Sequence, residues 1–308
     1  MKILITGGAG FIGSHVADLL IQNDFDISII DNLSSGKLEN INPSARFYNF
    51  DIRDSGVFKI IEAEKPQIVI HNAAQMSVRN SVENPINDAG INIIGGLNVL
   101  EACKKFKVEK IIFASSGGVV YGEQQYFPAD ENHPTKPISP YGVAKLSFEK
   151  YLFYYSYIFG LKYIALRYAN VYGPRQDPFG EAGVVAIFSK KLLNNEQPVI
   201  NGDGKQTRDY VYVKDVATAN LAAVQQDFIG EINIGTGIET DVNNIFNILK
   251  EAAGQKELKE SHAPAKEGEQ RRSVLSYKRA QEVLGWEPKM ELKIGLAETY
   301  NWFKEFSK

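Results

Sequence analysis

The chain has 308 residues, of which 37 are acidic and 34 basic, so the formal net charge is −3. Apolar residues make up 44% and charged residues 23%, which is typical of folded globular proteins and excludes a disordered chain, a collagen-like fibre and a coiled coil. The near balance of charge argues against an electrostatic hold on nucleic acid or on an anionic membrane. Cys103 is the only cysteine, which excludes an intramolecular disulfide and favours a cytoplasmic protein without a metal site.

Short apolar runs alternate with amphipathic stretches through the first half of the chain. Strands are expected near 2–6, 27–31, 46–50, 67–71, 110–114 and 162–167, and helices near 11–23, 54–64, 85–107 and 141–159. Strands that alternate with helices predict a parallel sheet covered on both faces. We therefore expect an α/β fold, a Rossmann-type doubly wound parallel sheet with a smaller, interwoven C-terminal substrate domain.

The second half of the chain is less regular. Helices are expected near 183–194, 277–284 and 291–306, two strands at 210–213 and 231–234, a helix between those strands, and a polar loop over 255–272. No linker separates the halves. We expect a cofactor-binding domain of residues 1–168 with about 210–240, and a substrate-binding domain of about 169–209 with 241–308.

A glycine-rich turn follows the first expected strand. Gly7, Gly10 and Gly13 have the spacing Gly-x-x-Gly-x-x-Gly, and the missing side chains let backbone N–H groups approach a diphosphate at the start of a helix. Asp31 ends the next strand, where a carboxylate accepts hydrogen bonds from both ribose hydroxyls and repels a 2′-phosphate. These features predict a dinucleotide site that prefers NAD to NADP.

The segments TGGAGFIG at 6–13 and DNLSSGK at 31–37 resemble the extended short-chain dehydrogenase/reductase family, and within it the NAD-dependent epimerases and dehydratases that act on nucleotide sugars. The resemblance covers nearly the whole chain. It implies bound NAD, which would contact Gly7, Gly10, Phe11, Ile12, Gly13, Asp31, Asn32, Ser35, Gly36, Asp51, Ile52, Ala73, Ala74, Gln75, Asn92, Ser115, Tyr141, Lys145 and Tyr168.

Tyr141 and Lys145 form the catalytic pair that the resemblance implies. The spacing Tyr-x-x-x-Lys also occurs at Tyr210 and Tyr300, so context decides. Ser139 precedes a proline and resembles a helix N-cap, and a helix beginning there places Tyr141 and Lys145 one turn apart on one face. A nearby ammonium favours the phenolate, which can act as a base. We expect structural roles for Tyr210 and Tyr300.

A serine pair lies between an expected strand and a loop. In the family, a hydroxyl at this place relays a proton between the tyrosine and O4 of the sugar. Alignment from the strand selects Ser116 as the relay, and Ser115 stays an alternative. Alignment from Tyr121 would instead place Gly117 there, because this chain has one more residue before Tyr121 than the commonest epimerase pattern.

The substrate contacts are also implied by the resemblance. Arg208, in the segment GDGKQTRDY, suits a diphosphate because its planar fork binds two oxygens. Lys266 stands where the family commonly has Arg, which weakens the expected grip, and Arg271 or Arg272 could compensate. Ser273 is either a small residue beside the C2 substituent of the sugar or an ordinary loop serine. The expected substrate-binding residues are Ser116, Tyr141, Asn170, Val184, Arg208, Lys266 and Ser273.

The expected reaction is the interconversion of UDP-glucose and UDP-galactose through a 4-keto sugar with retained NAD, with UDP-GlcNAc as a further substrate. Related dehydratases carry Asp-Glu where this chain has Gly117 and Gly118, which argues against water elimination. The rivals are a dehydratase or reductase on the same scaffold and a non-catalytic NAD sensor. Dense aromatic residues at 141–160 fit the homodimer interface that the family places there.

Overall fold

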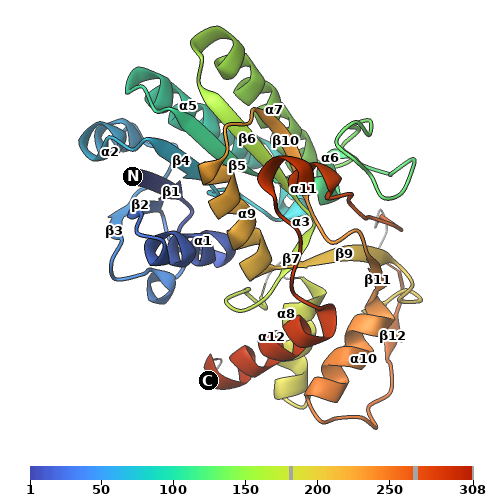
Figure 1. The fold of residues 1–308 in the computed structure, drawn as a ribbon. Coiled ribbons are helices and arrows are strands. Elements are labelled where there is room, and N and C mark those ends of the chain that lie inside the picture. The colour runs from blue at the N-terminus through green and yellow to red at the C-terminus, as the bar shows by residue number, and fades with distance from the viewer. Residues whose placement is uncertain (180–182, 266–269, 307–308) are drawn as a thin grey trace.

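The computed structural model describes residues 1–179, 183–265 and 270–306. Its centre is a seven-stranded parallel sheet with the order β10-β6-β5-β4-β1-β2-β3 (Figure 1). The order reverses at β1, which lies between β2 and β4, and ligands of such sheets bind at the carboxyl edge beside this reversal. The strands are β1 (Lys2–Thr6), β2 (Asp26–Asp31), β3 (Arg46–Asn49), β4 (Ile68–His71), β5 (Lys110–Ser116), β6 (Lys162–Tyr168) and β10 (Gly230–Ile234). The expected α/β doubly wound sheet is confirmed.

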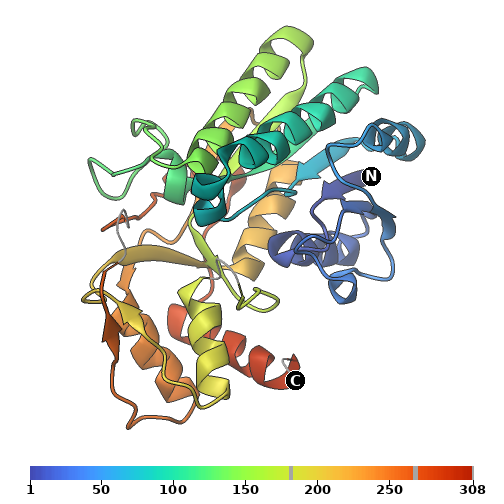
Figure 2. The same ribbon diagram turned by 180° about the vertical axis from the view of Figure 1, so that it is seen from behind.

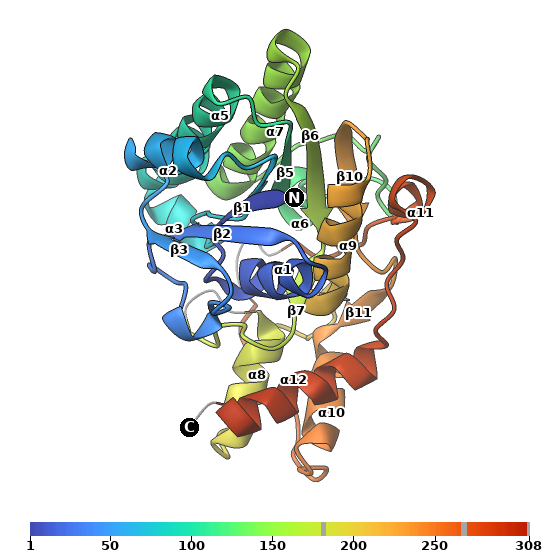
Figure 3. The ribbon, with the colours of Figure 1, turned by 60° about the vertical axis from the view of Figure 1, so that its left-hand side comes forward.

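Helices cover both faces of this sheet because its strands carry apolar side chains on both sides. One core contains Val16, Leu20 and Val216, and the other contains Val57, Val99 and Phe148. Figure 3 shows α1 and α9 of the first helical layer in front of the sheet, and Figure 2 shows α5 and α7 side by side in the second. The first layer is α1 (Phe11–Gln22), α9 (Val213–Gln225) and α11 (Lys278–Leu284), and the second is α2 (Gly56–Glu64), α5 (Gly96–Lys105) and α7 (Pro140–Phe159).

A smaller layer lies beyond the carboxyl edge of the large sheet, at the bottom of Figure 1. It holds a three-stranded sheet and a two-stranded sheet, packed on helices whose core includes Phe188, Phe246 and Leu296. The strands are β11 (Glu239–Asp241), β9 (Thr207–Tyr212), β7 (Asn170–Tyr172), β8 (Ile200–Asn201) and β12 (His262–Ala263), and the helices are α8 (Val184–Leu193), α10 (Val242–Ala252) and α12 (Leu292–Phe306).

The structure differs from the sequence expectation in two places that matter for the site. The expected helix at 85–107 is divided into α4 (Pro85–Ala89), a π-helical turn η2 (Gly90–Gly95) and α5, and a short helix α3 (Val78–Glu83) precedes it. A one-turn helix, α6 (Gly117–Val120), occupies the place of the loop expected after β5. A further short element is η1 (Leu38–Asn40). No helix among the described residues is both long and apolar enough to cross a membrane.

Candidate active site

The glycine turn between β1 and α1 brings two backbone segments unusually close. Gly7 has φ of 71°, and a Cβ there would lie 2.6 Å from the backbone N of Ala73 at the end of β4. A Cβ on Gly13 would lie 2.2 Å from the carbonyl oxygen of Gly7. Only glycine fits at either position, so the backbone of this turn can approach a diphosphate, and Gly10 precedes the first turn of α1.

Asp31 lies directly beside this turn. Its side chain is 7% exposed, and its Oδ2 accepts a hydrogen bond from the N–H of Ala9 at 3.0 Å. Its Oδ1 accepts from the N–H of Leu33 at 2.8 Å. The carboxylate is therefore held by backbone groups at the edge of the turn, near Gly36, with Ser35 exposed next to it. This placement fits an acceptor for ribose hydroxyls.

Asp51 lies on the strand edge next to Asp31, after β3. It accepts hydrogen bonds from Asn32 Nδ2 at 2.9 Å and from Arg53 Nε at 2.9 Å. The Arg53 guanidinium lowers the pKa of Asp51 to about 2. Ile52 is buried beside it. Asp51 therefore keeps its charge at neutral pH, and Arg53 is a neighbour that the sequence did not suggest.

The end of β4 forms the opposite wall. Both polar atoms of the Asn72 side chain are buried without a hydrogen-bond partner among the described residues. A polar group of a bound ligand would supply the hydrogen bonds that these two atoms lack. Gln75 donates its backbone N–H to Asn92 Oδ1 at 2.9 Å, and Asn92 Nδ2 donates to the carbonyl oxygen of Gln75 at 2.9 Å. Ala73 and Ala74, between these residues, are partly exposed. The glycine cradle and the unsatisfied amide both fit a dinucleotide.

Helix α7 begins at the same edge because Ser139 caps it, accepting from the N–H of Gly142 at 3.1 Å. Tyr141 is half-buried in the first turn. One turn later, Lys145 Nζ lies 5.6 Å from the centroid of the Tyr141 ring and donates to the carbonyl oxygen of Ala114 at 2.8 Å. Burial lowers the pKa of Lys145 to about 8, and the carboxylates of Asp88 and Glu149 oppose that shift.

The two serines at the end of β5 have different surroundings. Ser115 is 3% exposed and donates to Glu149 Oε1 at 2.6 Å. Ser116 is half-buried, and no described residue forms a hydrogen bond with its hydroxyl. Side chains alternate along a strand, so the two hydroxyls point to different sides. The hydroxyl of Ser115 is engaged inside the protein, which favours Ser116 as the relay.

Gly118 in α6 lies close to both Ser116 and Asn170, a residue expected from the sequence to bind substrate. A Cβ on Gly118 would lie 3.8 Å from both Ser116 Oγ and Asn170 Oδ1. Tyr168 pairs with Ser116 across the sheet, but it is 4% exposed and its hydroxyl accepts from Asn220 Nδ2 at 2.8 Å. Burial raises the pKa of Tyr168, so its phenol stays protonated at neutral pH.

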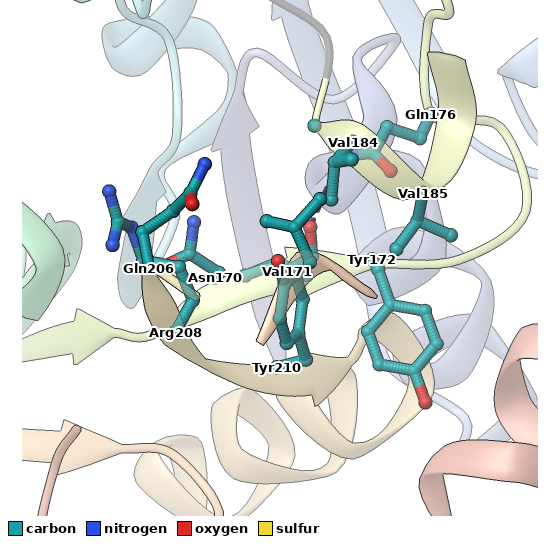
Figure 4. Close-up of a pocket in the computed structure, with 11 residues that line it drawn as sticks. Asn170, Val171, Tyr172, Gln176, Val184, Val185, Gln206, Arg208 and Tyr210 are labelled. Atoms are coloured by element: carbon teal, nitrogen blue, oxygen red, sulfur yellow. Dashed lines mark hydrogen bonds between the residues drawn. The ribbon is translucent and has the colours of Figure 1, made fainter. Parts of the chain in front are cut away.

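A cavity of about 150 Å³ lies between β7, β9 and α8. Three of the residues that line it were expected from the sequence, namely Asn170, Val184 and Arg208. Figure 4 shows the polar ends of Asn170, Gln206 and Arg208 gathered on one side and the valines of α8 on the other. Gln206 and Tyr210 also line it, although the sequence assigned Tyr210 a structural role. Strand alternation from Arg208 is the signal that could have found both.

The residues of the third expected substrate segment are only partly described. Lys266 lies outside the described residues. Ser273 is 3% exposed, two positions before Leu275, whose side chain packs on Gly117. The segment therefore passes beside α6, the short helix that begins directly after Ser116.

The two arginines of that segment have carboxylate partners. Arg271 forms a bidentate salt bridge with Asp203, with N···O distances of 2.8 and 2.9 Å. Arg272 forms one with Glu239, at 2.9 and 2.7 Å. These pairs bring the segment against β11 and the turn before β9. The structure thus brings together Tyr141, Lys145, Ser116 and Asn170, with the glycine turn on one side and the cavity on the other.

Three solved 4-epimerases are similar to this chain in sequence and in fold. A UDP-glucose 4-epimerase of Thermotoga maritima, solved with UDP-glucose, is 50% identical, with a TM-score of 0.98 and full coverage of both chains. A UDP-glucose 4-epimerase of Thermus thermophilus, solved with NAD, is 42% identical, with a TM-score of 0.94 and coverage of 99% of this chain and 100% of that one. A UDP-N-acetylglucosamine 4-epimerase of Methanobrevibacter ruminantium, solved with UDP-N-acetylmuramic acid, is 37% identical, with a TM-score of 0.94 and coverage of 99% and 98%.

The family model that matches covers residues 3–235, from β1 to the end of the large sheet. This range includes the glycine turn, both serines, and the Tyr141–Lys145 pair. The chain belongs to the NAD dependent epimerase/dehydratase family.

Proposed function

We propose that this protein is an NAD-dependent nucleotide-sugar 4-epimerase that interconverts UDP-glucose and UDP-galactose. The observation that carries the proposal is the position of Lys145, whose ammonium is bonded to Ala114 at the end of β5 and lies beneath the ring of Tyr141. Ser116 and Asn170 flank Gly118 between this pair and the Arg208 cavity. A nucleotide sugar that extends from the Arg208 cavity to the Tyr141–Lys145 pair would present its reactive carbon to Tyr141.

The chain's own residues supply the acid–base chemistry. Tyr141 accepts the proton of the C4 hydroxyl directly or through Ser116 Oγ, and it returns that proton when the hydroxyl re-forms. Lys145 stabilises the phenolate by its charge. NAD held at the glycine turn and beside Asp31 would supply a hydride acceptor and donor for C4, and inversion requires the 4-keto sugar to turn over in the pocket so that hydride returns to its opposite face. No net oxidation results, so the cofactor need not leave between turnovers.

Substrate and cofactor are assigned to different parts of the chain. We assign NAD to residues 1–168 with about 210–240, and the nucleotide sugar to about 169–209 with 241–308. Arg208 and Asn170 line the same cavity, where the guanidinium suits a diphosphate. Val184 gives that cavity an apolar wall, against which a flat base would pack. The cytoplasmic location predicted from the lone Cys103 stays a prediction.

The rival functions differ in measurable ways. A dehydratase needs an acid and a base after the relay serine, and Gly117 and Gly118 offer neither. A reductase consumes its cofactor, and a sensor has no need for the Tyr141–Lys145 arrangement. Incubation of the purified protein with UDP-glucose, UDP-GlcNAc and UDP-glucuronate, followed by NMR of the products, tests these alternatives. We expect UDP-galactose to form from UDP-glucose without added cofactor. The proposal would be refuted if none of the three sugars were inverted at C4.

We also propose that the protein is a homodimer that pairs through α7. Along that helix Tyr151, Phe153, Tyr154 and Tyr157 are exposed, and Ile94 in the adjacent η2 is 60% exposed. Exposed aromatic residues gathered on one face are typical of interfaces. Tyr154→Glu should convert a dimer to a monomer in sedimentation velocity. Ile238→Glu, at an exposed isoleucine just before β11 in the smaller layer, is the control, and a parent that sediments as a monomer would refute the proposal.

A further inference from the structure

A buried carboxylate lies one helical turn beyond the catalytic lysine on α7. Tyr141, Lys145 and Glu149 are spaced by four residues and so share one face of the helix. Glu149 is fully buried and Arg167, its partner on β6, is 3% exposed. A charge buried so deeply is costly unless it is paired, and no step of the proposed reaction needs a carboxylate at this position.

The contacts of Glu149 join three elements of the site. Its Oε1 accepts from Ser115 Oγ at 2.6 Å and from Arg167 Nε at 2.9 Å, and its Oε2 accepts from Arg167 Nη2 at 2.6 Å. Ser115 and Arg167 are direct neighbours across β5 and β6. One carboxylate thus bonds helix α7 to two adjacent strands, at the residue just before Ser116.

The network continues past the ion pair to the short helix behind the site. Arg167 Nη1 donates to the hydroxyl of Tyr121 at 3.0 Å, and that hydroxyl donates to Asn233 Oδ1 at 2.7 Å. Tyr121 directly follows α6, the helix that begins after Ser116. The end of β5 is therefore tied to α7 on one side and to β10 on the other.

We propose that Glu149 is the positioning residue of this site, holding the helix that carries Tyr141 and Lys145 in register with the strand that carries Ser116. This assignment rests on the proposed 4-epimerase function. Misplacement of a reacting group by about 1 Å costs on the order of 100-fold in rate, so a bond that sets the spacing of tyrosine and serine acts on kcat rather than on substrate binding.

The chain offers a matched control at the opposite edge of the same sheet. Glu64, at the end of α2, accepts from Arg46 Nε and Nη2 at 2.9 and 2.7 Å and from the hydroxyl of Tyr48. It is also buried, with 6% exposure. This cluster has the same three groups as the Glu149 cluster, a carboxylate, a guanidinium and a hydroxyl, but it touches no residue of the site.

The experiment compares four variants of the full-length protein loaded with NAD. Ser115→Ala and Tyr48→Phe each remove one hydroxyl donor, and Glu149→Gln and Glu64→Gln each remove one charge. We expect Ser115→Ala and Glu149→Gln to lower kcat about tenfold or more with KM within about twofold. The two control variants should change the melting temperature and leave kcat near that of the parent.

Hydrogen exchange of backbone amides at 114–120 in the same proteins gives a readout that needs no turnover. It should accelerate in Ser115→Ala and Glu149→Gln and not in the controls. If the parent fails to epimerise any sugar, the proposed function fails, and exchange alone decides the positioning role. If Glu149→Gln does not fold, Ser115→Ala decides. Unchanged kcat and unchanged exchange in Ser115→Ala would overturn the proposal, as would equal losses of kcat in the controls.

Discussion

Lys145 and Ala114 are joined by a hydrogen bond of 2.8 Å between the lysine Nζ and the backbone carbonyl oxygen. The bond links the first turns of α7 to the end of β5 and leaves the ammonium beneath the ring of Tyr141. A backbone carbonyl cannot move aside without distorting the strand. The ammonium that we propose assists the tyrosine is therefore held in place by the sheet itself.

The pH dependence of turnover should reveal Lys145. Burial lowers its pKa from 10.5 to about 8, while Asp88 and Glu149 raise it, and the nearby His71, with its pKa lowered to about 3, stays neutral. The ammonium is thus present below about pH 8 and lost above it, so kcat should fall as the pH rises through that value. Lys145→Arg stays charged at every accessible pH. Its kcat, although lower, should lack the falling limb, and an identical limb in both proteins would contradict the assignment.

Tyr141→Phe should remove most of the activity while the protein still folds and retains NAD. Loss of a general acid–base group costs about 10²–10⁴-fold in rate. Tyr300→Phe is the matched control, because Tyr300 has the same spacing to a lysine but is buried in α12. Turnover by NMR, with NAD content measured after denaturation, checks both. Near-full activity of Tyr141→Phe would remove its role.

Replacing Ser116 should lower kcat much more than replacing Ser115. Ser116→Ala removes the hydroxyl beside Gly118 and should lower kcat about 10²-fold or more, as expected for a proton relay. Ser115→Ala removes the bond to Glu149 and should cost about tenfold. Steady-state kinetics with UDP-glucose measures both effects. The reverse order of effects would place the relay one residue earlier.

Asp31 should exclude NADP. Its carboxylate is held beside the glycine turn by the N–H groups of Ala9 and Leu33, so it cannot withdraw from a 2′-phosphate. Denaturing the purified protein should release NAD or NADH and no NADP. Asp31→Asn should bind NADP more tightly relative to NAD, whereas Asp26→Asn, at the far end of β2, should not. Recovery of NADP from the parent would refute the argument.

Ser273 should decide which sugars fit. It is 3% exposed and its segment packs on α6, so a larger side chain has no solvent to enter, and overpacking costs about 1–3 kcal/mol. We expect the parent to epimerise UDP-GlcNAc as well as UDP-glucose, and Ser273→Tyr to suppress UDP-GlcNAc selectively. Ser276→Tyr, nearby but half-exposed, is the control. Equal losses on both sugars would show general damage to the fold.

Local patterns in the sequence were enough to predict the large sheet and the glycine turn that follows its first strand. The strand that ends at Thr6, the glycines after it and Asp31 lie within one βαβ unit, where apolar periodicity and turn chemistry are strong signals. The N-cap at Ser139 likewise singled out Tyr141 from two other tyrosines with the same spacing. These signals depend on neighbours in the chain, so they survive without a structure.

The rest of the site depends on contacts between distant residues. Strands β7 and β11 have three residues each, too few for a period to show. The π-helical turn that lets Asn92 reach Gln75 has no distinctive composition. Glu149 resembles an ordinary polar helix residue until Ser115 and Arg167 are brought to it. Its buried position is a property of the packed sheet, which no local pattern encodes.

The passage from β6 to β7 has a mechanical consequence. Tyr168 ends the large sheet's strand and Asn170 begins the small sheet's strand, so Ala169 alone separates the two. The N–H of Ala169 is itself bonded to the carbonyl oxygen of Ile234 at 2.8 Å. A single residue whose backbone is hydrogen-bonded has too little conformational freedom to serve as a hinge between the two sheets. Local unfolding of either sheet therefore disturbs the other directly, and both sheets should unfold in a single cooperative transition.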